Sequence, residues 1–411
     1  MSVTKPVEGR YTRIVGVLRL IIAFGAVPAL SLATPLVVVP VIARYYGGDG
    51  IVAVSVGQSV GAVAGIVVAL AWPLIGPAAV ARADGPTRQQ LYVASLRSRY
   101  VVLAAITLPA AATAAVLVNS HRLESAGCAV AVAGYGLTAS WYYSGTGDGT
   151  GLVRYEALPR VAASALSGLL ILGGAPLMTY PVLLILSVVI TNYLNSLRIL
   201  GKPHPRIGFR DVGLRDQVSV TASRLVNGLY SAGAVSVVSA VAPAASLLFA
   251  SCDRVQKPLL NASAALPQAL LSLIVGPGGS SRSRLNQVLL ANALFAIAIG
   301  ISFYAAFPYL MRVLYSDVVT PSTALALATA TGLGIGAFAR ALLSNGLLAV
   351  QDDRFATQSL LVVSGVGLVG IVVGAVTSGA LGALWAFAAA ELGFVLIAGV
   401  RLVVLGVRDE S

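Results

Sequence analysis

The chain contains twelve apolar runs, and this repetition constrains the fold more than any other feature of the sequence. A helix needs about 20 apolar residues to cross about 30 Å of hydrocarbon, and each run approaches or exceeds that length. Hydrophobic residues make up 57% of the 411 residues and charged residues only 10%, which excludes an ordinary soluble domain. The predicted fold is therefore an all-α integral membrane protein with about twelve transmembrane helices, at 14–42, 50–80, 100–118, 127–144, 158–175, 180–197, 217–240, 243–276, 285–307, 322–349, 357–376 and 380–404.

The basic residues fall unevenly on the two sides of these runs. If the N-terminus is cytoplasmic, 19 of the 27 Lys and Arg residues, among them Arg99 and Arg160, lie in cytoplasmic segments or at the cytoplasmic ends of spans, and three lie in outside segments. By the positive-inside rule, this asymmetry predicts a multi-pass protein with both termini in the cytoplasm. Aromatic groups at span ends, Tyr45 with Tyr46 and Trp141 with Tyr142 and Tyr143, are predicted to lie at the membrane interfaces.

The net charge of +12 does not indicate a nucleic-acid partner. The basic residues are scattered between apolar runs and form no cluster interleaved with aromatic residues, as nucleic-acid binding requires. The two cysteines, Cys128 and Cys252, lie in separate predicted spans, and the histidines His121 and His204 have no acidic or Cys partner at ligand spacing. We therefore predict no disulfide framework, no metal site and no cofactor.

A weak internal repeat divides the chain into halves, because short motifs recur at a constant offset of 200 residues beside even-numbered spans. The repeat predicts two six-helix lobes, residues 1–200 and 201–411, related by an axis along the membrane normal. Such a 6+6 architecture is typical of alternating-access transporters, which bind substrate between their lobes. The paired motifs are LIGP at 74–77 before Arg82 with LIVGP at 273–277 before Arg282, and YYSG at 142–145 before Arg154 with LLSNG at 342–346 before Arg354.

Five basic residues lie away from the ends of the predicted spans, where a cation at the bilayer centre costs about 2.5–3.5 kcal/mol. They are Arg19, Arg224, Arg254, Lys257 and Arg340. Helical spacing places polar residues on one stripe of each of two successive spans, so both stripes are predicted to line one aqueous cavity. The stripe of the seventh span comprises Gln217, Thr221, Arg224, Asn227 and Ser231, and that of the eighth comprises Arg254, Lys257, Asn261, Gln268 and Ser272.

Two explanations apply to these cations. Three of them lie near cytoplasmic helix ends and can snorkel to the inner headgroups, and one of the three, Arg340, can instead pair with Glu391. Arg254 and Lys257 lie deeper, about 16 and 21 Å along their span. Asp253, four residues before Lys257, can neutralise one of the two, which leaves an excess positive charge. Because an excess cation in a cavity favours an anionic ligand, and Arg suits phosphate oxygens, the cluster is predicted to bind phosphate.

Four stretches of the chain resemble the polysaccharide flippases of the multidrug, oligosaccharidyl-lipid and polysaccharide exporter superfamily. These carriers move undecaprenyl-diphosphate-linked oligosaccharides across the bacterial inner membrane. Together with the twelve spans, the resemblance covers nearly the whole chain. The stretches are PLVVVPVIARYYGGDG at 35–50 with GPAAVAR at 76–82, WYYSGTGDGTGLVRYEAL at 141–158, DRVQKPLLNASAALPQALL at 253–271 and LLSNGLLAVQDDRFAT at 342–357.

The resemblance implies a transporter, not an enzyme, that flips such a lipid from the cytoplasmic to the outer leaflet of the bacterial cell membrane by alternating access. The implied partners are the lipid-linked oligosaccharide substrate, the lipid bilayer and other polysaccharide-assembly proteins. In that family, helices 1, 2, 7 and 8 line a central cavity whose basic residues attract the diphosphate. The matching residues here are Arg19, Arg224, Arg254 and Lys257, with Asp253, Asn227, Asn261 and Gln268 as supporting polar residues.

Three other functions account for parts of the sequence. A drug or cation antiporter of the same fold normally needs an intramembrane carboxylate, and Asp253 and Glu391 qualify. A net positive cavity would repel its cationic substrates. An enzyme acting on sugars needs paired carboxylates, whereas the acids outside the membrane are scattered on short connections. A non-transporting scaffold leaves the two polar stripes without a role.

Overall fold

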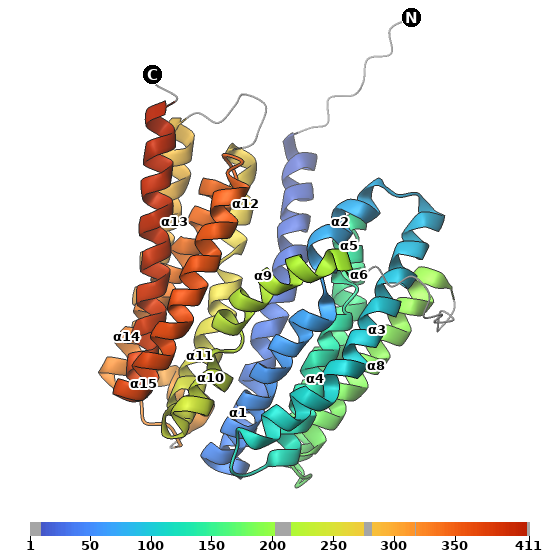
Figure 1. The fold of residues 1–411 in the computed structure, drawn as a ribbon, viewed down its shortest axis with the longest axis vertical. Coiled ribbons are helices and arrows are strands. Elements are labelled where there is room, and N and C mark those ends of the chain that lie inside the picture. Colours follow the sequence, from blue (N-terminus) through green and yellow to red (C-terminus); the bar gives the residue numbers. More distant parts are fainter. Residues whose placement is uncertain (1–9, 202–214, 275–281, 317, 409–411) are drawn as a thin grey trace, which may run out of the picture.

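The structure, a computed structural model, describes residues 10–201, 215–274, 282–316 and 318–408, with side chains described within 38–201, 221–270, 283–316 and 318–405 except at residue 223. The described residues form helices joined by short connections, and Figure 1 shows these helices as two bundles. This arrangement confirms the predicted all-α fold.

The first bundle contains the first six spans. Its elements are α1 (Arg10–Ala69), α2 (Trp72–Arg82), α3 (Gly85–Val116), α4 (Arg122–Gly134), the 3-10 turn η1 (Tyr135–Leu137), α5 (Ser140–Thr146), α6 (Gly149–Leu152), the π-helical turn η2 (Val153–Ala157), α7 (Leu158–Leu172) and α8 (Thr179–Leu200).

The second bundle contains the last six spans and packs against the first mainly through α1. Its elements are α9 (Arg215–Ser231), α10 (Ala234–Val241), the 3-10 turn η3 (Pro243–Ala245), α11 (Ser246–Ala262), α12 (Ala265–Ile274), α13 (Arg282–Tyr315), α14 (Thr323–Ala341), the π-helical turn η4 (Leu342–Leu347) and α15 (Asp353–Arg408).

Two of these helices, α1 and α15, each contain two spans separated by a glycine reversal. Gly47 has φ 59° and ψ −154° in α1, and Gly379 has φ 63° and ψ −145° in α15. Glycine adopts this backbone region without the steric penalty that a Cβ atom brings. The chain therefore turns back within a few residues, and the twelve predicted spans are all helical in the described residues.

Seven helical segments of the described chain are long and apolar enough to cross a membrane by length and composition. The last of these, residues 353–405, holds two of the predicted spans. The protein is therefore a multi-pass membrane protein. Helix α1 begins and α15 ends at the same end of the molecule (Figure 1), as an even number of spans requires. That this end faces the cytoplasm of a bacterial cell stays a prediction.

One pair of repeat motifs occupies equivalent places in the two bundles, whereas residues 275–277 of the other pair lie outside the described residues. Residues 142–145 lie in α5 at the end of the fourth span, and residues 342–346 lie in η4 at the end of the tenth. Arg154 and Arg354 follow at the beginning of the next spans. This placement agrees with the predicted 6+6 architecture, whereas the division into lobes at residue 200 stays a prediction.

Span two packs closely on span four through three glycines spaced four residues apart. A Cβ atom at Gly61 would lie 2.6 Å from the carbonyl oxygen of Ala129 and 2.8 Å from the Cβ atom of Val132. Gly57 and Gly65 meet the backbone of the same region, residues 125–136. Small residues let transmembrane helices approach until their backbones touch, which is the main source of attraction between helices in lipid.

The segment 82–99, predicted to be a cytoplasmic connection, is instead mostly helical. Helix α3 begins at Gly85 because the Asp84 side chain accepts a hydrogen bond of 3.1 Å from the Thr87 N–H, and the bonds from Thr87 lower the pKa of Asp84 below its usual value. Arg99, counted above among the cytoplasmic cations, is fully buried in this helix. Its guanidinium donates to main-chain carbonyls exposed where α4 breaks before α5, at Gly136 (3.1 Å) and Thr138 (2.7 Å).

The prediction that Trp141 and Tyr143 lie at the membrane interface is wrong. Both side chains are 2% exposed and belong to an aromatic core of the first bundle that also includes Trp72 and Tyr92. Trp141 packs on Trp72 with ring centroids 5.0 Å apart. The prediction failed because the fourth span is interrupted after Gly134, and the aromatic residues follow this break inside the bundle.

Candidate functional site

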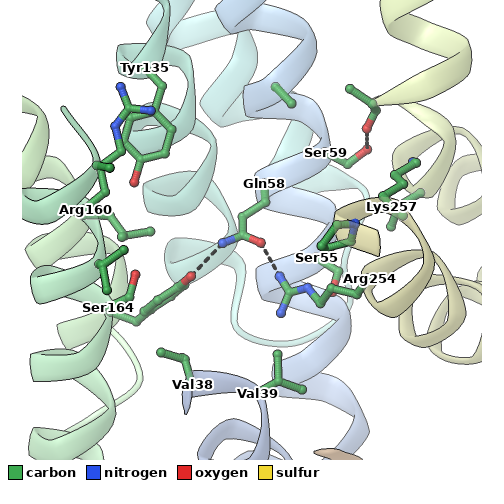
Figure 2. Close-up of a pocket in the computed structure, with 18 of the residues that line it drawn as sticks. Val38, Val39, Ser55, Gln58, Ser59, Tyr135, Arg160, Ser164, Arg254 and Lys257 are labelled. Carbon is green, nitrogen blue, oxygen red and sulfur yellow. Dashed lines mark hydrogen bonds between the residues drawn. The ribbon is translucent and has the colours of Figure 1, made fainter. Parts of the chain in front are cut away.

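A cavity of about 610 Å³ lies between the two bundles, and we call it the central cavity. Its walls come from α1, η1, α5, α6, η2, α7 and α8 of the first bundle and from α10 and α11 of the second. Figure 2 shows Arg160 and Tyr135 on one wall, Arg254 and Lys257 on the opposite wall, and Gln58 between them. The charged residues that line it are Glu156, Arg160, Asp253, Arg254 and Lys257.

Arg254 reaches across the boundary between the bundles. Its guanidinium donates a hydrogen bond to Oε1 of Gln58, and Nε2 of Gln58 donates to the hydroxyl of Tyr180 over 2.7 Å (Figure 2). Helices α11, α1 and α8 are thereby connected by one chain of hydrogen bonds. Because the partner of Arg254 is a neutral amide, this contact leaves the charge of the guanidinium uncompensated.

Lys257 lies one helical turn further along α11 and is paired with Asp253. Its Nζ atom lies 2.6 Å from Oδ1 of Asp253, in the (i, i+4) arrangement that the sequence predicted. The side chains of Lys257 and Asp253 are 22% and 13% exposed, so the pair is partly open to the cavity. The structure thus brings together three of the predicted site residues, Asp253, Arg254 and Lys257, on one wall of the central cavity.

The opposite wall contains a charged pair that the sequence analysis missed. Glu156 in η2 accepts from Nη2 of Arg160 over 2.7 Å, and Arg160 also lies over the ring of Tyr135 at 4.3 Å. Three further donors surround the carboxylate, which is nearly buried. They are the hydroxyl of Thr138 at 2.8 Å, the N–H of Ala139 at 2.6 Å and the amide of Asn195 at 2.8 Å.

The charges of the central cavity leave an excess of one cation. Glu156 is paired with Arg160 and Asp253 with Lys257, whereas Arg254 is bonded to a neutral amide. Among the described charged residues of this lining, Arg254 is therefore the cation without a carboxylate partner. Two of the three cationic side chains are paired with carboxylates and the third is not, so the cavity has a net positive charge that suits an anion.

The other predicted site residues lie elsewhere. Arg224 donates to the carbonyl of Leu70, where the second span breaks between α1 and α2, and it is outside the described lining of the central cavity. Asn227 and Asn261 line a second cavity, discussed below, while Gln268 is exposed and lines neither cavity. The side chain of Arg19 lies outside the described residues. Their role in substrate binding stays a prediction.

The sequence contains a spacing that could have predicted the pair of Glu156 and Arg160. An acid precedes a base by four residues in both EALPR, from Glu156 to Arg160, and DRVQK, from Asp253 to Lys257. On a helix this spacing places both side chains on one face. Arg160 of the first pair was assigned to the cytoplasmic side, but the helical segment that carries both residues begins earlier, at Gly149.

Comparisons with known proteins bear on the fold. No family model matches the chain, and no curated protein matches it. Among solved structures, it is similar to the lipid II flippase MurJ in an inward closed conformation, with a TM-score of 0.63 and 13% identity over 92% of this chain and 86% of that chain.

A multidrug resistance MATE family transporter is similar in its inward-facing conformation, with a TM-score of 0.60 and 15% identity over 93% of this chain and 95% of that chain. A multidrug resistance MATE family transporter in an outward-facing conformation gives a TM-score of 0.52, with 14% identity over 97% of both chains. At such identities the likeness concerns the fold. The chain has the all-helical, two-lobe fold of this lipid II flippase and of the MATE transporter.

Proposed function

We propose that the protein is a transporter that flips an undecaprenyl-diphosphate-linked oligosaccharide from the cytoplasmic to the outer leaflet of the bacterial cell membrane. The central cavity, open between two bundles, takes the diphosphate, while the lipid tail stays in the bilayer. Rocking of the bundles then presents the headgroup outside, and no covalent chemistry is needed.

One observation carries the proposal, namely that Arg254 faces the central cavity with no carboxylate partner in the described lining. A guanidinium offers several N–H donors in a planar fork, which matches phosphate oxygens. Lys257 lies one turn away, and its pairing with Asp253 is partly open to the cavity. A diphosphate can therefore contact both cations from one position.

A drug or cation antiporter is the second candidate function. It is favoured by the two carboxylates of the central cavity, Glu156 and Asp253, and by the fold shared with multidrug transporters. Both carboxylates are already paired with cations, at 2.7 and 2.6 Å. The sign of the charge on the preferred ligand separates this function from the flippase.

The test is native mass spectrometry of the purified protein with undecaprenyl diphosphate in competition with a cationic dye. We expect the wild type to retain the lipid in preference to the dye. Arg254→Ala should weaken lipid binding about 10- to 100-fold, because it removes a charge-assisted contact. Lys257→Ala should weaken it less, because Asp253 already compensates this cation.

The control for this experiment is Arg312→Ala, which removes a cation exposed at the end of α13 and should leave lipid binding unchanged. Retention of the dye in place of the lipid, with indifference to Arg254→Ala, would establish the antiporter and refute the flippase.

A further inference from the structure

The second bundle contains another polar cavity, of about 360 Å³, which we call the C-bundle cavity. It lies among α9, α11, α14, η4 and α15, and its volume falls within the range of about 300–1,000 Å³ typical of small-molecule sites. Lys257 lines both this cavity and the central cavity. A ligand with one group against Lys257 in the central cavity can therefore place an adjacent group in the C-bundle cavity.

The position of the C-bundle cavity along α11 follows from the helix itself. Arg254, Lys257 and Asn261 are spaced by three and four residues, so they lie on one face. The first and last are separated by about 10 Å along the axis. The central cavity contains Arg254 and the C-bundle cavity contains Asn261. The face thus passes from a cation that suits phosphate to an amide that suits a neutral polar group.

The lining of the C-bundle cavity mixes donors and acceptors. The hydroxyl of Tyr230 donates to Oε1 of Glu391 over 3.0 Å, and Oδ1 of Asn227 accepts from the hydroxyl of Ser364 over 3.2 Å. Nη1 of Arg340 is buried and has no hydrogen-bond partner among the described residues. This unused donor, beside amides and a carboxylate, indicates a ligand that both accepts and donates hydrogen bonds.

Aromatic rings also line the cavity. The rings of Tyr230 and Phe387 are stacked, with centroids 5.5 Å apart and an angle of 21° between their planes. Both rings belong to the lining. An apolar surface bordered by hydrogen-bonding groups matches a sugar ring, whose C–H faces are apolar and whose hydroxyl groups donate and accept.

We propose that the C-bundle cavity binds the first sugar of the substrate while its diphosphate lies against Arg254 and Lys257. This inference rests on the proposed function and adds to it a separate saccharide subsite, formed by Asn261, Asn227 and Arg340 with the Tyr230 ring. Lys257, at the junction of the two cavities, contacts the phosphate that carries the sugar.

The experiment compares two lipids, undecaprenyl diphosphate and undecaprenyl diphosphate that carries one N-acetylglucosamine, by their dissociation constants in native mass spectrometry. The wild type should bind the glycosylated lipid about 10-fold more tightly, as two or three additional hydrogen bonds provide. Asn261→Ala should abolish this preference and leave the affinity for the bare diphosphate within about twofold. Retained binding of the bare lipid also reports that the variant is folded.

The matched control is Gln358→Ala, which removes an amide from the exposed face of α15, outside both linings, and should preserve the preference. Equal affinity of the wild type for the two lipids would overturn the subsite and leave the flippase proposal intact. An equal loss for both lipids in Asn261→Ala would also overturn it. If the wild type binds neither lipid, the proposed function fails and the subsite with it.

Discussion

Glu156→Leu should lower the free energy of unfolding by about 2–5 kcal/mol, because each buried donor left without its acceptor costs about 1–3 kcal/mol. The substitution removes the carboxylate partner of Arg160. It also leaves the main-chain N–H of Ala139 and the amide of Asn195 without their acceptor. These groups hold the break between α4 and α5, so the first bundle loses its fixed geometry there. Glu156→Gln keeps one acceptor oxygen and should cost less than the leucine variant.

The measurement is thermal unfolding in detergent, followed by tryptophan fluorescence, to which Trp141, buried two residues after Ala139, contributes. The matched control is Glu124→Leu, which removes another acid of the same bundle. Glu124 is paired with His121 at 3.6 Å near the surface, so its loss should cost less than about 1 kcal/mol. Equal unfolding temperatures for the two leucine variants would show that the network around Glu156 does not hold the break.

Gly61→Ala should lower the free energy of unfolding by about 1–3 kcal/mol, although alanine is the better helix former. The new Cβ atom would lie 2.6 Å from the carbonyl oxygen of Ala129 and 2.8 Å from the Cβ atom of Val132. Neither atom is the end of a flexible side chain, so span two has to move away from span four. That movement separates the backbone contacts formed at the other two glycines as well.

The control variant should change the free energy of unfolding in the opposite direction. Gly365 lies in α15 and has nothing within 4 Å of its ideal Cβ position, so Gly365→Ala should stabilise the protein by about 0.4–1 kcal/mol. Both variants are compared in the same thermal or detergent-induced unfolding experiment. A stabilised Gly61→Ala protein would mean that the two spans tolerate separation and that the glycines do not set their distance.

The spans themselves were predictable because lipid imposes a strong requirement on sequence. Each backbone polar group must be satisfied inside the membrane, so a long apolar run has to be a helix. The limits of the spans were less predictable. Arg99 and Arg160 were assigned to cytoplasmic segments, yet α3 and the span ending in α7 continue past them, and both guanidiniums bind groups within the bundle. A charge ends an apolar run in sequence without ending the helix.

The predicted stripes were only partly correct in space, since they assumed straight helices. Helix α11 ends at Ala262, and Gln268 in α12 no longer continues the face that carries Arg254. Arg224 illustrates another limit, because its acceptor is the carbonyl of Leu70. Leu70 has a φ of 52°, a left-handed conformation that is uncommon for leucine. No local signal predicts that this carbonyl is available to a residue 154 positions away.

The hydrogen bonds described between the two bundles lie in one region, so the distance between the bundles can be measured elsewhere on their surface. They join Gln58 to Arg254, Ser59 to Ala232 and Ser236, and Leu70 to Arg224, and so they end on one stretch of α1 and its C-terminal edge. Both native thiols, Cys128 and Cys252, are fully buried. A pair of reporter cysteines placed on exposed turns of the two bundles can therefore be labelled with maleimide spin probes without first removing the natural ones, and the spectra would report the separation of the bundles directly.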